Sequence, residues 1–273
     1  MPNEVPVTVV IPCFNHGQFV RDAIRSVEEC DQAAYELIIV NDGSTDSFTQ
    51  QVMKELEAEG YHVINQTNQG LAAARNNGIR AGTGRYALPL DADNLIRPNY
   101  LRVATELLDK LPEVAVVYGR PAYFGENTDR HFDIGGAFDL FRLLRDNYID
   151  ACAVIRKSAF EECGGFDSAM PSPGYEDWDL WLKFVARGHR LHFVDEILFD
   201  YRIRHDSMIH KAVAGNGFPK VFAYLCEKHP LFALQAQVTK LERELANRDR
   251  SKILKVAKVY WNFKNAIRAR LSG

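Results

Sequence analysis

The sequence predicts an α/β fold in which helices flank a mostly parallel, Rossmann-like sheet. Short, fully apolar runs rich in Val and Ile alternate with helical patterns up to residue 112. Strands that are apolar on both sides are typical of a parallel sheet with helices on both faces. Polar clusters follow three of these strands, at the edge where ligands of such sheets bind.

The expected elements follow one another along the chain. Strands are expected over residues 7–11, 36–40, 61–64 and 86–90, and the intervening helices over 17–29, 46–59 and 70–81. After residue 113, strands are expected over 114–119, 121–124, 151–155, 191–194 and 197–203, with a helix over 175–188. Right-handed crossovers are expected between the parallel strands.

Composition limits the function classes. The chain has 273 residues and a net charge of −3, which fits one large domain with an appendage and gives no argument for a nucleic-acid partner. Five scattered cysteines form no CxxC pair, which indicates reduced thiols in the cytoplasm. The first residues lack the pattern of a signal peptide, and no apolar run is long enough to span a bilayer.

Two carboxylates stand one residue apart at the end of the expected strand 86–90, in the sequence ALPLDADN. If extended geometry persists, Asp91 and Asp93 point to the same side of the strand and converge. A divalent cation such as Mg²⁺ or Mn²⁺ stabilises such a pair, and ligand phosphates complete its shell. The alternative is a loop in which both aspartates face water or cap the next helix.

Three acidic residues, Glu176, Asp177 and Asp179, open the expected helix 175–188. The helix dipole favours acids in a first turn, and Asp179 is spaced to pair with Lys183. Asp177 shares a face with apolar residues, so its carboxylate is expected at an apolar edge. It serves there either as a general base that the dipole keeps ionised, or only as a partner of that dipole.

A basic cluster follows the last expected strand, in YRIRHDS at residues 201–207. Arg202 and Arg204 suit a phosphate group. His205 either adds a nitrogen ligand to a metal ion or is an ordinary surface residue. No His or Cys spacing suggests a zinc site.

Taken together and in chain order, these motifs resemble those of family 2 glycosyltransferases, which have the GT-A fold. The matching segments are VTVVIPCFN, ELIIVNDGSTD, NQGLAAARNNGIRAGTGRYALPLDADN, GGFD, YEDWDLWLKF and YRIRHDSM. They cover about residues 5–209. The resemblance implies a GT-A domain over residues 1–209, followed by a C-terminal helical extension over 210–273.

The resemblance also implies roles for matching residues. A donor site is implied for Pro12, Phe14, Asn15, Asp42, Ser44, Gly70, Arg75, Asp91 and Arg202. Asp91 is expected at the donor ribose, and Asp93 at Mn²⁺ or Mg²⁺, with Asp91 and His205 as further contacts to the metal. Asp177 is the expected catalytic base, in a pair with Glu176.

The implied reaction is metal-dependent transfer of a sugar, with inversion, from a nucleoside-diphosphate sugar. A UDP-sugar is favoured as donor, and the acceptor is a hydroxyl of a glycan, a lipid-linked molecule or another compound, as in polysaccharide biosynthesis. Asp177 takes the acceptor proton while the oxygen attacks C1, and the metal and nearby cations stabilise the departing diphosphate.

Other functions stay open on the sequence alone. A non-enzymatic nucleotide- or carbohydrate-binding module would not need Asp177. A sugar nucleotidyltransferase would carry a Gly-rich, basic signature near the first strand, which is absent. A dinucleotide-binding dehydrogenase is disfavoured because no GxGxxG follows that strand.

The C-terminal part carries two further patterns. Apolar residues recur at three- and four-residue steps, as in a helix that packs on a partner: Leu231, Leu234, Val238, Leu241 and Leu245. Residues 251–273 combine an apolar stripe with basic residues and no acid, which suits either an anionic membrane surface or a helix docked on the catalytic domain. Peripheral membrane contact or self-association through residues 231–271 is therefore expected, in the cytoplasm or at the inner face of a membrane.

Overall fold

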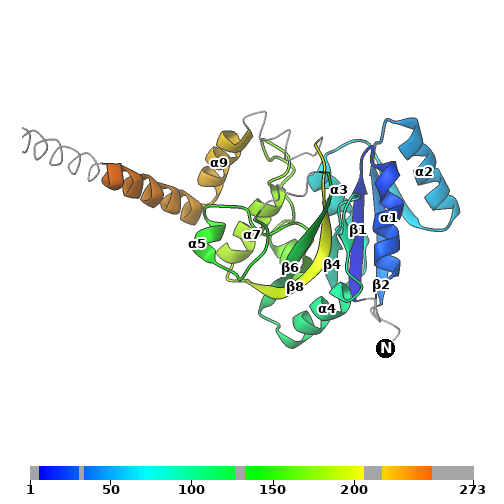
Figure 1. Cartoon of the computed structure of the whole chain (residues 1–273), viewed down its shortest axis with the longest axis horizontal. Coiled ribbons are helices and arrows are strands. Elements are labelled where there is room, and N and C mark those ends of the chain that lie inside the picture. The colour runs from blue at the N-terminus through cyan, green and yellow to red at the C-terminus, as the bar shows by residue number, and fades with distance from the viewer. Residues whose placement is uncertain (1–5, 31–33, 127–132, 206–216, 248–273) are drawn as a thin grey trace, which may run out of the picture.

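A computed structural model describes residues 6–30, 34–126, 133–205 and 217–247 of the chain (Figure 1). Within these residues, the centre is an eight-stranded sheet with the order β3-β2-β1-β4-β7-β6-β8-β5. The strands are β1 (Val7–Cys13), β2 (Tyr35–Asp42), β3 (His62–Gln66), β4 (Tyr86–Pro89), β5 (Leu95–Ile96), β6 (Val114–Gly125), β7 (Val154–Arg156) and β8 (Arg190–Ile203).

The pairing of the strands confirms the predicted mostly parallel sheet. The strands β3, β2, β1 and β4 run parallel, and Val10 of β1 lies beside Ile38 of β2 and Pro89 of β4. β7 is antiparallel to β4 and β6, β6 and β8 are parallel, and β5 is antiparallel to β8. The carboxyl ends of β1, β2 and β4 therefore meet at one edge.

Two pairs of expected strands are continuous in the structure. The segments expected at 114–119 and 121–124 form the single strand β6, and those at 191–194 and 197–203 form β8. The two long strands pair with each other, and register shifts around Arg120 let the ladder continue past the irregular stretch. Such bulges bend a strand without ending its pairing.

The helices occupy most of the expected ranges. They are α1 (Gly17–Glu28), α2 (Ser47–Ala58), α3 (Leu71–Ala81), α4 (Tyr100–Lys110), α5 (Leu140–Leu143), α6 (Lys157–Glu162), α7 (Glu176–Ala186), α9 (Gly217–Lys228) and a helix at 230–247. Asp46 caps α2, because its Oδ1 accepts a hydrogen bond of 2.7 Å from Thr49 N. Gly188, with a φ of 81°, follows the end of α7.

Alternate residues of the sheet face two separate apolar clusters. Val10 and Ile38 belong to the cluster that contains α3, α6, α7 and α9. Their neighbours Val9 and Ile39 belong to the cluster that contains α1, α2 and α4. This alternation follows from the two-residue period of a strand, and it explains why the central strands read as continuously apolar.

The first part of the C-terminal extension packs into the core. Val221 and Leu225 of α9 and the following Phe232 are fully buried and join the cluster around Trp178 and Trp181. The helix at 230–247 then projects away from the body (Figure 1). The division of the chain at residue 210 stays a prediction, but the described extension shares the core of the preceding domain.

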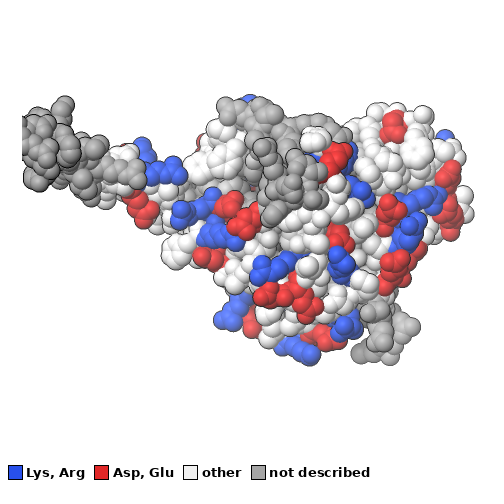
Figure 2. Space-filling model, viewed as in Figure 1, with Lys and Arg blue, Asp and Glu red and all other residues white. Residues whose placement is uncertain are grey.

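The charge distribution of the surface and the character of the helices bear on which partners the protein can bind. Acidic and basic side chains are interspersed over the face in Figure 2, in keeping with the net charge of −3. No helix within the described ranges has the length and apolar character needed to cross a bilayer. The basic pattern at residues 251–271, for which membrane contact was expected, lies outside the described residues.

Candidate active site

A cavity of about 850 Å³ opens at the carboxyl ends of β1, β2 and β4 and extends to the start of α7 and the end of β8. Its walls include most of the residues that the sequence predicts: Pro12, Phe14, Asn15, Asp42, Gly70, Arg75, Asp91, Asp93, Glu176, Asp177 and Arg202. Segments far apart in the sequence are thus brought together at the edge where open α/β sheets bind ligands.

Asn15 joins the loop after β1 to the loop after β2. Its Oδ1 accepts hydrogen bonds from the N–H groups of Thr45, at 2.8 Å, and Asp46, at 3.1 Å. Its own N–H donates to Ser44 Oγ at 3.1 Å. The φ of Asn15 is 56°, a left-handed conformation that asparagine tolerates better than most residues. The loop that presents Phe14 to the cavity is therefore held by these contacts.

The buried carboxylate of Asp42 organises the loop that leads into α3. Its Oδ1 accepts hydrogen bonds from Gln66 Nε2 and Gln69 N, both at 2.8 Å. Its Oδ2 accepts one from Gly70 N at 2.9 Å. Gly70 has a φ of 87°, which favours glycine at this turn. Asp42 thus supports the cavity wall at the predicted donor end.

Arg75 is buried and joins two acidic motifs. It donates from Nη2 to Asp91 Oδ1 at 2.6 Å and from Nη1 to Glu176 Oε1 at 2.8 Å. Glu176 Oε2 also accepts hydrogen bonds from two backbone N–H groups just before α7. Close packing fixes α3, because a Cβ on Gly78 would lie 2.3 Å from Val10 Cγ1. Glu176 is therefore an ion-pair partner of Arg75, and its predicted catalytic role stays a prediction.

Asp91 and Asp93 do not continue the extended strand, which corrects the predicted convergence on one strand face. β4 ends before them, and a hydrogen bond of 2.9 Å from Asn94 N to the Asp91 carbonyl closes a turn. The turn directs Asp91 to Arg75 and brings Asp93 Oδ2 to 3.2 Å from Arg204 Nη1. Each carboxylate has its own cation, which eases their mutual repulsion.

Two arginines at the carboxyl end of β8 and just beyond it approach Asp93. Arg202 Nε donates to the carbonyl oxygen of Asp93 at 2.9 Å, and its guanidinium lies over two phenylalanine rings. Arg204 is buried, and its Nη1 lies 3.0 Å from His16 Nε2. Burial and the charge of Asp91 raise the pKa of Asp93, although His16 and Arg204 act in the opposite direction.

Asp177 opens α7 and is 8% exposed. Its Oδ1 accepts hydrogen bonds from Asn147 Nδ2 at 3.0 Å and from Trp178 N at 2.8 Å. Burial, followed by the charges of Glu176 and Asp150, raises the pKa of Asp177 well above its usual range. Burial and the nearby acids thus act against the helix dipole, which favours the ionised carboxylate, and the prediction that the dipole keeps Asp177 ionised stays a prediction.

Sequence reasoning missed Asp150 and Asn147, which line the same cavity. The strand expected at 151–155 begins three residues later, because the chain first forms a turn in which Cys152 N donates to Asp150 Oδ1 at 2.8 Å. Burial and the charge of Asp91 raise the pKa of Asp150 to about 7. The sequence signal was slight, a single acid directly before an apolar run.

Two predicted site residues lie outside the cavity wall. Ser44 is buried behind Asn15 and supports it. The His205 side chain is 77% exposed, and its Nε2 lies 3.7 Å from Glu126 Oε2. His205 lies beyond the end of β8 and does not line the cavity that contains Asp93, which corrects the expected metal contact. His16 is the histidine that lies near Asp93.

The donor set of the cavity fits a hard divalent cation. Asp91, Asp93 and Asp150 line one cavity, and burial, followed by the charge of Asp91, raises the pKa values of Asp93 and Asp150. Carboxylate oxygens are the ligands that Mg²⁺ and Mn²⁺ prefer. The described residues include no group of three or more His, Cys, Asp or Glu side chains placed to hold a metal. This part of the protein thus offers only part of a coordination shell.

Comparison with known proteins identifies the family. The chain matches the family model "Glycosyl transferase family 2" over residues 8–164, more than half of its 273 residues. The protein belongs to glycosyl transferase family 2, as the sequence motifs predict.

Related sequences agree. An uncharacterized glycosyltransferase of Rickettsia conorii is 27% identical over 206 residues, which cover 72% of this chain and 34% of that protein. The poly-beta-1,6-N-acetyl-D-glucosamine synthase of Staphylococcus epidermidis is 25% identical over 211 residues, 73% of this chain and 48% of the synthase. The putative glycosyltransferase EpsE of Bacillus subtilis is 29% identical over 212 residues, 74% and 73% of the two chains. The chain thus spans about a third of the first relative and less than half of the synthase.

Solved structures confirm the predicted GT-A fold. Residues 1–349 of S. aureus TarS, in complex with UDP-GlcNAc, superpose with a TM-score of 0.61 at 17% identity, and the match covers 75% of this chain and 60% of that fragment. The mannosyltransferase PcManGT from Pyrobaculum calidifontis, in complex with GDP-Man and Mn²⁺, gives a TM-score of 0.62 at 18% identity. The match covers 80% of this chain and 63% of the PcManGT chain.

Proposed function

We propose that this chain is a metal-dependent, inverting glycosyltransferase that uses a nucleoside-diphosphate sugar, with a UDP-sugar favoured. One observation carries the proposal. One cavity is lined by the polar loops that follow β1 and β2, by Asp91 and Asp93, and by the α7 carboxylate Asp177. This combination supports a site that binds a nucleotide, a diphosphate and an acceptor hydroxyl together.

The donor end has the chemistry of a nucleotide pocket. Phe14 is 41% exposed at the cavity and offers a ring face to a base. Asn15 and Asp42 fix the surrounding loops. Asp91 keeps a partly exposed carboxylate beside Arg75 and is the proposed acceptor for ribose hydroxyl groups.

Asp93 is the proposed metal ligand, with Asp91 beside it. A bound Mn²⁺ or Mg²⁺ would neutralise charge on the diphosphate as it leaves. Arg202 contacts the carbonyl oxygen of Asp93 and Arg204 contacts its carboxylate, and the guanidinium groups of both suit phosphate oxygens. The binding of Mn²⁺ by PcManGT supports this assignment.

Asp177 is the proposed general base. It removes the proton of the acceptor hydroxyl while that oxygen attacks C1 from the face opposite the diphosphate, so the C–O bond to the diphosphate breaks as the new one forms. Burial and the nearby acids raise the pKa of this carboxyl, which makes its ionised form a stronger proton acceptor. Asn147 and Trp178 N orient it, and Glu176 holds Arg75 nearby.

The acceptor is proposed to be a sugar or lipid-linked hydroxyl, as in polysaccharide biosynthesis. The S. epidermidis relative is named as a polysaccharide synthase, which supports this class. The experiment is to incubate the full chain with a panel of nucleotide sugars, with Mn²⁺ or a chelator, and to measure nucleoside diphosphate release. Release from one donor that depends on Mn²⁺ is the expected result. No release from any donor, with or without glycan acceptors, would contradict the proposal.

A further inference from the structure

The helix at residues 230–247 carries an apolar stripe that stays exposed among the residues that the structure describes. Its five members are between 39% and 59% exposed: Leu231, Leu234, Val238, Leu241 and Leu245. They follow one another at steps of three, four, three and four residues, which is the a/d spacing of a heptad repeat. The helix extends away from the body in Figure 1, so the sheet and its covering helices leave the stripe open.

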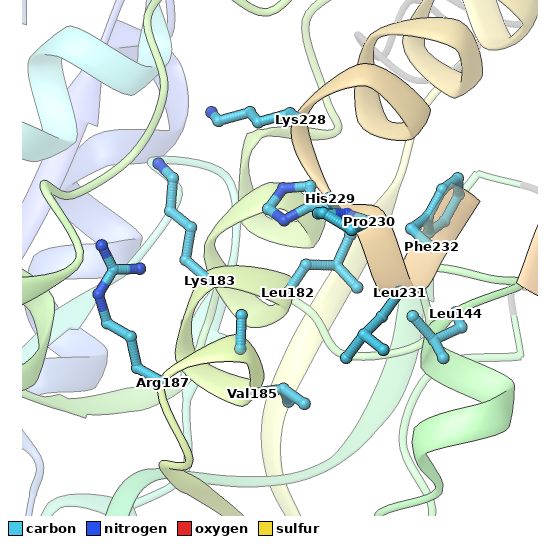
Figure 3. A pocket seen from close by; sticks show the side chains of 11 residues that line it. Leu144, Leu182, Lys183, Val185, Arg187, Lys228, His229, Pro230, Leu231 and Phe232 are labelled. Atoms are coloured by element: carbon cyan, nitrogen blue, oxygen red, sulfur yellow. The ribbon is translucent and has the colours of Figure 1, made fainter. Parts of the chain in front are cut away.

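The apolar surface continues from the stripe onto the body. Figure 3 shows Leu231 beside Val185 and Leu144 at a cavity of about 290 Å³. Three basic groups at this cavity, Lys183, Lys228 and His229, share the carboxylate of Asp179, and Arg187 also lines the cavity. Most of the other lining side chains are apolar, so an apolar side chain of a partner can pack there.

The charges of the helix narrow the choice of occupant. Residues 230–247 carry two basic residues, Lys240 and Arg243, and two acidic residues, Glu242 and Glu244, so their net charge is zero. A helix that binds an anionic membrane has a basic polar face, which this helix lacks. Polar side chains at the positions that flank the stripe, Gln235 and Glu242 among them, are typical of a coiled-coil seam.

We propose that a second copy of this chain covers the stripe, so that the helices at 230–247 form a two-stranded coiled coil and the protein is a dimer. The repeat predicts the partner, because a/d knobs fit the holes of a facing helix with the same spacing. The helix is about 27 Å long, so the seam is short. The dimer is therefore expected to dissociate in the micromolar range.

Sedimentation equilibrium of the full chain across the micromolar range tests the proposal. The parental mass is expected to rise from that of one copy to that of two as concentration increases. The double variant L234K/L241K places two charges in the seam and is expected to weaken dimerisation by about tenfold or more. Circular dichroism establishes that the variant keeps the parental helical content and melting temperature.

The matched control is A246K/N247K, which adds the same charge to the same helix at exposed positions outside the stripe. It is expected to dimerise like the parent. If the parent has the mass of a single copy at every concentration, the proposal is overturned. If, in addition, anionic vesicles sediment the parent but not L234K/L241K, the stripe binds a membrane instead of a second copy. A dimer that L234K/L241K leaves unchanged would also overturn the proposal, because another surface would then form the interface.

Discussion

His229 Nε2 lies 2.8 Å from Oδ1 of Asp179, and this contact joins the C-terminal extension to the helix that carries Asp177. Asp179 is fully buried and also contacts Lys183 Nζ at 2.7 Å and Lys228 Nζ at 2.9 Å. Three basic groups from two parts of the chain thus meet one carboxylate, two residues beyond the proposed base.

Replacing this carboxylate is expected to destabilise the fold. In Asp179→Asn, Lys183 and Lys228 lose their shared partner in a mostly buried setting, and breaking such a cluster costs about 3 kcal/mol of unfolding free energy. Urea denaturation at pH 7 measures the loss. The control is Asp195→Asn, which removes an exposed ion pair with Arg120 and is expected to cost less than about 1 kcal/mol. Equal losses in the two variants would contradict the assignment.

The same cluster predicts a dependence on pH. Burial alone would raise the pKa of Asp179, but the hydrogen bond with His229 and the charge of Lys183 lower it below its usual range. A carboxyl whose pKa is lower in the folded state than in the unfolded state stabilises the fold. This stability is fully present above the pKa of the unfolded state, about 3.9, and is lost as the pH falls below it. The stability gap between the parent and Asp179→Asn is therefore expected to be constant between pH 5 and 7 and to shrink below about pH 4.

Much of the sheet could be predicted because its strands are apolar on both faces. Val9 and Val10 point to opposite clusters, which leaves the central strands without polar alternation, as expected for a parallel sheet. The breaks expected within β6 and β8 were wrong because pairing between two long strands overrides the local signals around Arg120. Such tertiary pairing is invisible in the local pattern.

The candidate site was predicted less completely. Asp93 and Asp177 stood in recognisable motifs, and the structure brings them to one cavity. The ion-pair partners of Asp91 and Asp93 are Arg75 and Arg204, and Arg204 in particular is distant from them in sequence. Asp150 could not be found for the same reason, because only the folded chain places it near Asp91.

Replacing Asp150 is expected to stabilise the fold, in contrast to the replacement of Asp179. Burial raises the pKa of Asp150 to about 7, whereas the pKa in the unfolded state is about 4. Ionisation of this carboxyl therefore lowers the free energy of unfolding as the pH rises above about 4, and the loss is complete above about pH 7. Asp150→Asn keeps an acceptor for Cys152 N and removes the charge. It is expected to raise the unfolding free energy by about 2 kcal/mol at pH 8 and to change it little at pH 4. Thermal melting at both pH values measures this, and a gain of equal size at pH 4 would contradict the explanation.

Asp93 is expected to be required for metal-dependent donor binding. Asp93→Asn removes one hard ligand but keeps a side chain that still reaches Arg204. Calorimetry with a nucleoside diphosphate and Mn²⁺ is expected to show affinity weakened by about tenfold or more, and affinity without metal nearly unchanged. The control is Asp195→Asn, outside the cavity. Parental affinity and parental metal dependence in Asp93→Asn would remove Asp93 from the metal site.

Asp177 is expected to be needed for turnover and not for binding of the donor. Asp177→Asn is nearly isosteric and can still accept hydrogen bonds from Asn147 and Trp178 N. Nucleoside diphosphate affinity with Mn²⁺ should therefore match the parent, while the transfer rate falls about 10²- to 10⁴-fold, the usual loss of a general base.

The pH dependence of the parental transfer rate distinguishes two roles of Asp177, that of a general base and that of a charge that only interacts with the dipole of α7. The pKa of Asp177 is raised by burial and by Glu176 and Asp150, and only the ionised carboxyl accepts a proton. The transfer rate at saturating donor should therefore rise with pH through that raised pKa and then level off, while the residual rate of Asp177→Asn lacks this rise. If Asp177→Asn transfers sugar at the parental rate, or keeps the same rise with pH, Asp177 is not the base and another group must take the acceptor proton.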